Sequence, residues 1–173
     1  MTIFDKSQSQ KGGFEKLLSK IPGFKGYLAK ESRRECDKLE RDFIARAFDS
    51  SREPLRRTVR AVAESGNFDA LRVIAGIDPL EKTIEKVANR VRFADYGYSG
   101  FFDAVKVEEP ELERLYAFDL ALYERAEQLE KRCRELPTLT GDPDALKAEI
   151  ELLNQLVREI DRDFDQRERI VSG

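Results

Sequence analysis

The amino-acid sequence predicts an all-α protein that folds as an elongated antiparallel helical bundle with coiled-coil-like packing. Three observations lead to this prediction. Apolar residues recur at intervals of three and four through most of the 173-residue chain, as they do on one face of an α-helix. Proline and glycine interrupt this pattern at a few points, where helices can begin and end. No segment keeps an alternation of apolar and polar residues, so no β-sheet is expected.

The first part of the chain predicts a short helix, a long helix and a second, shorter helix. Residues 14–19 fit the short helix, which ends at the proline and glycines that follow it. Residues 28–48 fit a long amphipathic helix with apolar positions between charged pairs. Pro54 suits the first turn of the next helix, which extends to Gly66.

Residues 67–94 predict a helix in two parts. Gly66 reads as the glycine that ends the preceding helix, and Asn67 as the N-cap of the next. Asp78 is a candidate N-cap for the second part, with Pro79 in its first turn or at a kink. The first part brings an apolar stripe of Phe68, Leu71, Ile74 and Ile77. The second part carries a heptad seam of Leu80, Ile84, Val87, Val91, Ala94 and Tyr98.

Two more helices with the same spacing complete the bundle. Pro110 begins the first and Asp142 with Pro143 begins the second, and residues 137–141 are short enough to make them an antiparallel hairpin. Their seams contain Leu112, Leu115, Asp119, Leu122, Ala126, Leu129, Cys133 and Leu136 in the first helix, and Leu146, Ile150, Leu153, Val157, Ile160 and Phe164 in the second. We expect this hairpin to bury the seam that starts at Leu80.

Length and composition favour one domain. Hydrophobic residues make up 40% of the chain and charged residues 38%, which is typical of a highly charged globular protein. Residues 1–12 are polar and without a helical period, so we expect a flexible N-terminus there and a single helical bundle domain over residues 13–173. The sequence contains neither an apolar run of roughly 20 residues nor a secretory signal, which predicts a cytoplasmic protein.

The residue types present exclude several kinds of chemistry. Histidine is absent, and with it the residue used most often for acid–base catalysis near neutral pH. Cys36 and Cys133 lie in separate charged stretches and are expected to be reduced and structural. The acids between Asp161 and Asp165 resemble the start of a calcium loop, but Gln166 replaces its essential glycine, so we expect a solvated helix face. We predict no enzyme, cofactor or metal site, with an enzyme built on carboxylates alone as the alternative.

Asp119 is a polar residue in an apolar seam. The heptad places it between Leu115 and Leu122, where an isolated carboxylate would be costly to bury. We therefore expect Asp119 to be a buried structural residue that fixes helix register through a hydrogen bond, with a catalytic acid as the alternative.

Two loops combine glycine with aromatic residues, one over residues 21–27 and the other over residues 96–103. One interpretation is that the rings plug an end of the bundle while the glycines form tight turns. The other is a docking patch for a protein or a lipid surface. The candidate partner-binding residues are Phe24, Lys25, Tyr27, Tyr96, Tyr98, Phe101 and Phe102. We expect both loops at the same end of the bundle, because aromatic rings are stabilised when they cluster.

The motifs Ile-Pro-Gly-Phe-Lys-Gly-Tyr at residues 21–27 and Tyr-Gly-Tyr-Ser-Gly-Phe-Phe-Asp at residues 96–103 carry a resemblance to a known family. Together with the segment Leu115-Tyr116-Ala117-Phe118-Asp119, they resemble a family of bacterial all-helical proteins that has no established activity. The likeness covers about residues 14–125. It implies an association with stomatin/flotillin-like membrane scaffold proteins.

These observations favour a helical adaptor or scaffold that acts through protein–protein contacts or self-association, and no small-molecule substrate is indicated. The first alternative is a peripheral membrane-associated partner of a membrane scaffold protein, which would place Lys20, Lys25 and Lys30 at an anionic surface. The second is a nucleic-acid-binding protein, and its candidate residues are Arg33, Arg34, Arg41, Arg56, Arg57 and Arg60. An excess of acids over bases after residue 65, 24 against 16, argues against the second alternative.

Overall fold

The computed structural model describes residues 13–21, 33–94 and 109–172, and nearly all of them belong to helices. No strand occurs among these residues, which confirms the all-α prediction. The elements in chain order are α2 (Gly13–Lys20), α4 (Arg33–Asp49), α5 (Arg52–Ser65), α6 (Phe68–Val73), the 3₁₀ turn η1 (Ile74–Gly76), α7 (Ile77–Arg92), α9 (Glu109–Glu135), the 3₁₀ turn η2 (Leu136–Leu139) and α10 (Pro143–Ser172).

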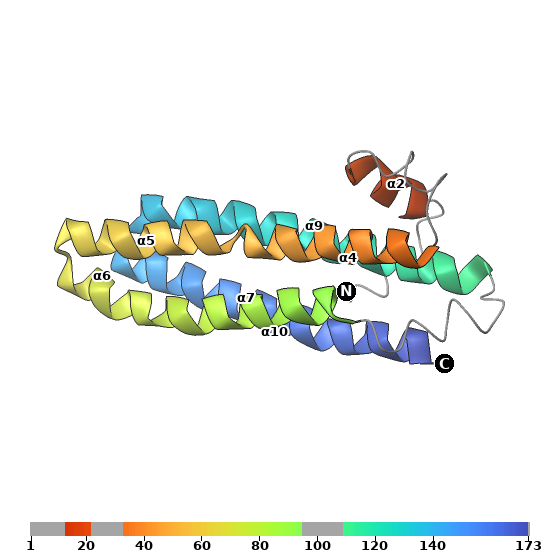
Figure 1. Ribbon diagram of the computed structural model, residues 1–173. Coiled ribbons are helices and arrows are strands. Elements are labelled where there is room, and N and C mark those ends of the chain that lie inside the picture. The colour runs from red at the N-terminus through yellow and green to blue at the C-terminus, as the bar shows by residue number, and fades with distance from the viewer. Residues whose placement is uncertain (1–12, 22–32, 95–108, 173) are drawn as a thin grey trace.

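The long helices lie side by side along a common direction (Figure 1). Helices α4 and α5 follow one another along one edge, and α6 and α7 return beside them. Helices α9 and α10 complete the assembly, and α7 packs against both α4 and α10. The short helix α2 packs on the side of α9. Among the described residues, no helix has the length and apolar content that a membrane crossing needs.

The turn between α5 and α6 follows the sequence prediction. Gly66 has a φ of 66°, a left-handed conformation that glycine adopts without steric cost, and it ends α5. The side-chain oxygen of Asn67 accepts hydrogen bonds from the backbone N–H groups of Asp69 and Ala70, at 3.1 and 3.2 Å. It thereby satisfies donors that have no partner within the first turn of α6.

The N-cap prediction for Asp78 is wrong, because the helix break lies earlier in the chain. Residues Ile74–Gly76 form a 3₁₀ turn, and α7 begins directly after it at Ile77. Asp78 lies in the first turn of α7 and pairs with Lys82 at 2.7 Å. The missing N–H of Pro79 costs nothing there, since the first-turn N–H groups have no helical acceptor.

A close contact between η1 and α10 accompanies this break. A Cβ atom added to Gly76 would lie only 3.0 Å from Cγ2 of Ile150. The side-chain amide of Asn154 donates hydrogen bonds to the carbonyl oxygens of Gly76, at 3.1 Å, and of Ile150, at 3.0 Å. Glycine therefore permits the approach, and Asn154 links the backbones of η1 and α10.

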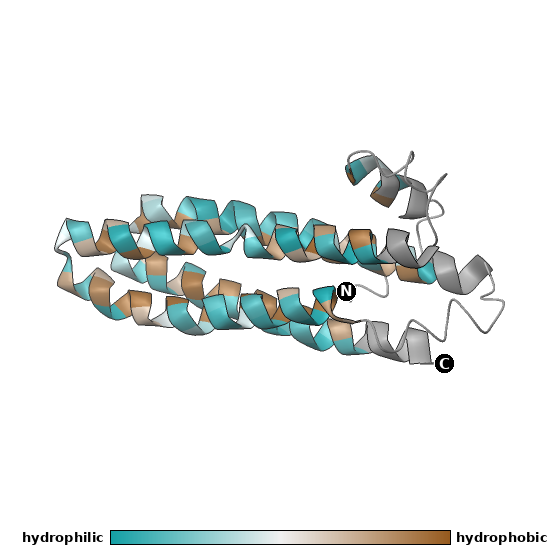
Figure 2. Cartoon of the chain, viewed as in Figure 1, coloured by the Kyte–Doolittle hydropathy of each residue, from teal (hydrophilic) through white to brown (hydrophobic). Residues whose placement is uncertain are grey.

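The predicted seams form the core. Leu80, Ile84 and Val87 are fully buried, and Val91 is 1% exposed. On the hairpin side, the residues expected to cover them are also buried: Leu115, Leu122, Leu129, Leu153 and Ile160. Figure 2 shows the resulting pattern, with apolar residues along the helix sides that face one another and polar residues outside. These burials confirm the helix faces read from the sequence, and apolar burial is the main stabilising contribution to such a fold.

Ion pairs flank the core between neighbouring helices. Asp161 of α10 pairs with Lys86 and Arg90 of α7, at 2.7 and 2.6 Å, and Asp163 pairs with Arg125 of α9 at 3.0 Å. The side chains of Asp161 and Asp163 are only 18% and 16% exposed. The expectation of a solvated face is therefore wrong for these two acids, because α7 and α9 bring cations against them.

Candidate functional site

The candidate docking residues predicted from the two aromatic loops lie outside the described residues. Phe24, Lys25 and Tyr27 fall within residues 22–32, and Tyr96, Tyr98, Phe101 and Phe102 fall within residues 95–108. Their proximity to one another and their role as a docking patch stay predictions.

Asp119 lies on α9 and is 2% exposed. Its neighbours in the seam, Leu115 and Leu122, are buried as well. The carboxylate therefore occupies a site away from solvent, where it can influence helix register. That it does so through a hydrogen bond remains a prediction.

The cations proposed for nucleic-acid or membrane binding are engaged within the chain wherever their side chains are described. Arg41 is 2% exposed, and its guanidinium donates to the carbonyl oxygen of Arg92 at 3.0 Å, at the C-terminal end of α7 where a positive charge is favourable. The remaining described cations form ion pairs: Arg56 with Glu81, Arg57 and Arg60 with Glu53, and Lys20 with Glu127. Arg41 in particular is too deeply buried to reach an external phosphate.

Two groups have strongly altered acidity. Burial raises the pKa of the Cys133 thiol to about 12, and the side chain is fully buried. Burial, together with the hydrogen bond that its hydroxyl donates to Glu127 at 2.9 Å, raises the pKa of Tyr123 to about 12. Both groups therefore stay protonated at neutral pH, which is the opposite of what an activated nucleophile requires. No cluster of potential metal ligands occurs among the described residues.

An open groove lies between α5 and the α6–α7 segment, and we call it the hairpin groove. Its volume is about 750 Å³. The apolar residues that line it are Val59, Leu71, Ile74, Ala75 and Ile77, and the charged residues are Glu53, Arg56, Arg60, Asp78 and Glu81. The η1 turn lies on one wall, where the backbone changes from α-helical to 3₁₀ geometry.

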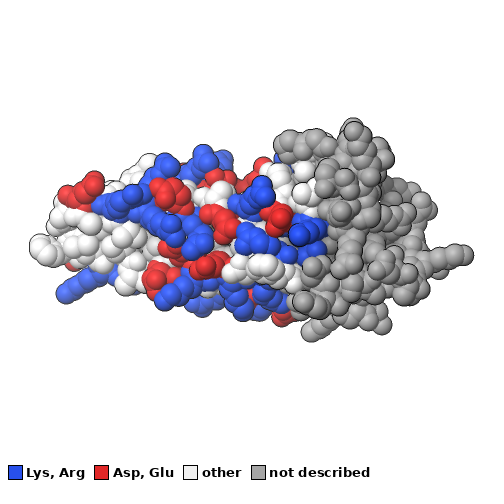
Figure 3. Space-filling view, in the orientation of Figure 1, with Lys and Arg blue, Asp and Glu red and all other residues white. Residues whose placement is uncertain are grey.

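Phe68 lies one helical turn before Leu71, which lines this groove, and it projects into solvent. It is 82% exposed, and Leu71, one turn further along α6, is 37% exposed. The sequence pattern placed both on one apolar stripe, and the structure leaves Phe68 exposed at the start of that stripe. Ala70 of the same helix is fully buried instead, and the 3₁₀ turn that follows α6 separates Phe68 and Leu71 from the buried Ile77. Figure 3 shows uncharged residues gathered at the end of the molecule where α5 and α6 meet.

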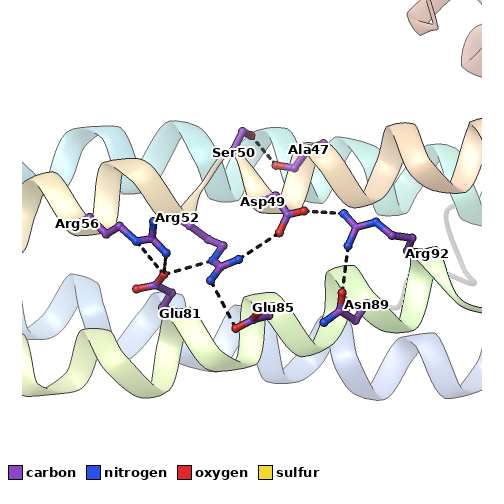
Figure 4. A network of polar contacts seen from close by, with 9 residues as sticks. All are labelled: Ala47, Asp49, Ser50, Arg52, Arg56, Glu81, Glu85, Asn89 and Arg92. Carbon is purple, nitrogen blue, oxygen red and sulfur yellow. Dashed lines mark hydrogen bonds and ion pairs between the residues drawn. The ribbon is translucent and has the colours of Figure 1, made fainter.

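A network of ion pairs borders the groove and joins its two walls (Figure 4). Glu81 of α7 accepts from Arg52 at 3.2 Å and from Arg56 at 2.7 Å, both on α5. Arg52 also reaches Asp49 and Glu85. Asp49 in turn pairs with Arg92 at 2.6 Å. The partly buried arginines thus connect α4 and α5 to α7, which fixes the distance between the groove walls.

A larger groove of about 1380 Å³ lies on the other side of α6 and η1, against α10. It is lined mostly by charged and polar residues of both signs, among them Arg72, Lys147, Glu151 and Arg158. Such a surface is compatible with water and does not require a partner. The hairpin groove is the better candidate site, because its floor is apolar and Phe68, one helical turn before the lining residue Leu71, is exposed.

The position of Phe68 could not be recognised from periodicity. The available signal was its place directly after the Gly66-Asn67 junction, where a new helix starts and its orientation is not determined by the preceding one. Comparisons of the chain with models of protein families, with curated proteins and with solved structures found no match.

Proposed function

We propose that this protein is a non-enzymatic helical adaptor or scaffold that acts by binding another protein or a second copy of itself. The observation that carries the proposal is the 82% exposure of Phe68, which lies one helical turn before Leu71, a residue of the apolar floor of the hairpin groove. Exposed aromatic residues near a groove are typical of interaction surfaces, where a few such anchors contribute most of the binding energy. The high pKa values of Cys133 and Tyr123 agree with a role that does not involve nucleophilic chemistry.

The scaffold in this proposal is an antiparallel bundle with coiled-coil-like packing. The buried heptad residues Leu80, Ile84, Val87 and Val91 support it, as seams of this spacing pack into the holes of facing helices. The cross-helix ion pairs also support it. Arg92, at the end of α7, pairs with Asp49 of α4, whereas Glu81, earlier in α7, pairs with Arg52 of α5. Such a rigid rod would hold its docking surfaces at fixed positions.

The aromatic loops are the second docking surface in the proposal. Their motifs support this role through the resemblance to the bacterial helical family, whose suggested partners are membrane scaffold proteins. The hairpin groove and the loops can then bind two different partners, which is what an adaptor requires.

Affinity capture with the full chain tests the proposal. Wild type, Phe68→Ser and Leu152→Ser are used as bait in a lysate of the source organism. Leu152 is 50% exposed on α10 and does not line the hairpin groove, so its replacement is the matched control. We expect a specific protein, or the chain itself, to be captured by wild type and by Leu152→Ser and to be lost with Phe68→Ser.

Two outcomes would contradict the proposal. One is capture that does not depend on Phe68. The other is binding to vesicles of anionic lipid, with no protein captured, which would favour the peripheral membrane alternative. Circular dichroism spectra of the three chains serve to establish that they are equally folded.

A further inference from the structure

We propose that the hairpin groove is occupied by the same face of a second copy of this chain, in a dimer with two-fold symmetry. This inference rests on the function proposed above and selects self-association as the way in which the groove is used. Two features support it: an exposed ring one helical turn before a residue that lines the groove, and groove walls of opposite charge.

The first feature is the combination of a projection and a hollow on one surface. A two-fold interface uses the same patch on both subunits, so that patch must carry both the inserted group and the site that receives it. Phe68 is the projecting group, with 82% of its surface exposed, and it lies one helical turn before the floor residue Leu71. The receiving site is the apolar floor formed by Val59, Leu71, Ile74 and Ile77, in a hollow of about 750 Å³. A groove of this size holds more than one side chain.

The second feature is the charge of the two walls. The α5 wall carries Arg56 and Arg60 with one acid, Glu53, whereas the α7 wall carries the acids Asp78 and Glu81 and no cation among the lining residues. If the two-fold axis runs along the groove, α5 of each copy lies over α7 of the other. The cationic wall then faces the acidic wall twice, which complements the charges and fixes the orientation of the copies.

The rim charges are already paired within the chain, which keeps the cost of assembly low. Arg60 pairs with Glu53 at 2.8 Å, and Asp78 pairs with Lys82 at 2.7 Å. Since these side chains are 51% to 73% exposed, they can rearrange towards a facing copy without leaving a buried charge unpaired.

Sedimentation velocity of the full chain over a range of concentrations tests the dimer. We expect wild type to dimerise and Phe68→Ser to weaken dimerisation by about 100-fold, because the dimer loses two rings and each loss costs about tenfold. Leu152→Ser should dimerise as wild type does. Circular dichroism shows whether each variant retains its helices.

Charge reversal tests the arrangement of the walls. Arg60→Glu places an acid on the α5 wall, and Asp78→Lys places a cation on the α7 wall, so that each variant alone opposes like charges at both contacts. Each is expected to dimerise more weakly than wild type. An equimolar mixture restores opposite charges at both contacts, and we expect it to form mixed dimers with an affinity close to that of wild type.

Three results would overturn the inference. These are a wild-type chain that stays monomeric up to about 100 µM, a dimer that does not depend on Phe68, or a mixture of the reversed variants that dimerises no better than its components. A monomeric chain that still captures a different protein through Phe68 would overturn the dimer and leave the adaptor function standing. A wild-type chain that neither dimerises nor captures another protein would overturn both proposals.

Discussion

Replacing Gly76 by alanine tests the close approach of η1 to α10. The added Cβ would lie 3.0 Å from Cγ2 of Ile150, whereas two carbon atoms are most stable at about 3.5 to 4.0 Å apart. Ile150 is 2% exposed and packed in the core, and its Cγ2 is bonded directly to its Cβ, so the contact cannot be relieved by moving only the flexible end of the side chain. The contact can only be relieved by shifting side chains or by moving α10 away from η1.

The magnitude follows from two opposing contributions. Replacing glycine by alanine within a helix stabilises the fold by up to about 1 kcal/mol, mainly because the unfolded chain loses conformational freedom. Overpacking a core by one methyl group costs about 1 to 3 kcal/mol. A displacement of α10 would also lengthen the 3.1 Å hydrogen bond from Asn154 to the Gly76 carbonyl, which contributes about 1 kcal/mol. We expect Gly76→Ala to lower the free energy of unfolding by about 1 to 2 kcal/mol.

Urea unfolding followed by circular dichroism at neutral pH measures this change, with Gly141→Ala as the matched control. A Cβ at Gly141 meets nothing within 4 Å, and we expect that variant to stay within about 0.5 kcal/mol of wild type. Ile150→Leu removes the methyl group at the β-carbon while keeping the side-chain volume. It should therefore recover part of the loss when combined with Gly76→Ala. A Gly76→Ala chain more stable than wild type, or the absence of any coupling to Ile150, would refute the reasoning.

Two further predictions concern titratable groups. Burial raises the pKa of Asp161, but the hydrogen bonds and charges of Lys86 and Arg90 outweigh it and hold the pKa below the ordinary value of 3.8. This carboxylate therefore stabilises the fold above about pH 4, and the stabilisation is lost as the pH falls through its lowered pKa. Asp161→Asn should be less stable than wild type at pH 7 and should lose less stability than wild type between pH 5 and pH 2, as measured by urea unfolding at each pH. If both chains lose the same stability between pH 5 and pH 2, the pairing of Asp161 is contradicted. The Cys133 thiol, with a pKa of about 12 and no exposed surface, should react with an aromatic disulfide reagent at pH 8 only as fast as the chain unfolds, measured by absorbance in a Cys36→Ser background. Labelling within seconds under native conditions would show that the site opens locally.

Local patterns in the sequence were sufficient for the helices and for their buried faces. The spacing from Leu80 to Val91 identified one face, and all four apolar residues of that face are buried. The junction of Gly66 and Asn67 could also be predicted from the sequence, since a left-handed glycine and a capping side chain act within a few residues. Asp142 caps α10 for the same reason, by accepting from the N–H of Ala145 at 3.0 Å.

Other features depended on which helices became neighbours. The sequence predicts Asp161 and Asp163 on a solvated helix face. It does not show that two arginines and a lysine of other helices, α7 and α9, pair with them. Arg41 is a candidate residue of the nucleic-acid-binding alternative, yet it is buried and donates to the backbone at the end of α7. A sequence pattern shows which side of a helix is polar, but it does not show which charge of another helix will face that side.

The candidate site shows most clearly which features follow from local sequence and which depend on the packing of distant helices. Sequence alone determined that α5 and α6 are joined by a tight glycine turn and that Phe68 starts the second helix. Only the tertiary structure decided that Phe68 projects into solvent and that Ala70 faces the core, because the contacts that orient α6 include those with the distant helix α10. The 3₁₀ turn of η1 is accommodated where Gly76 meets Ile150, a contact between residues 74 positions apart. Helical periodicity is a local property, whereas the packing that interrupts it is set by contacts between distant segments of the chain.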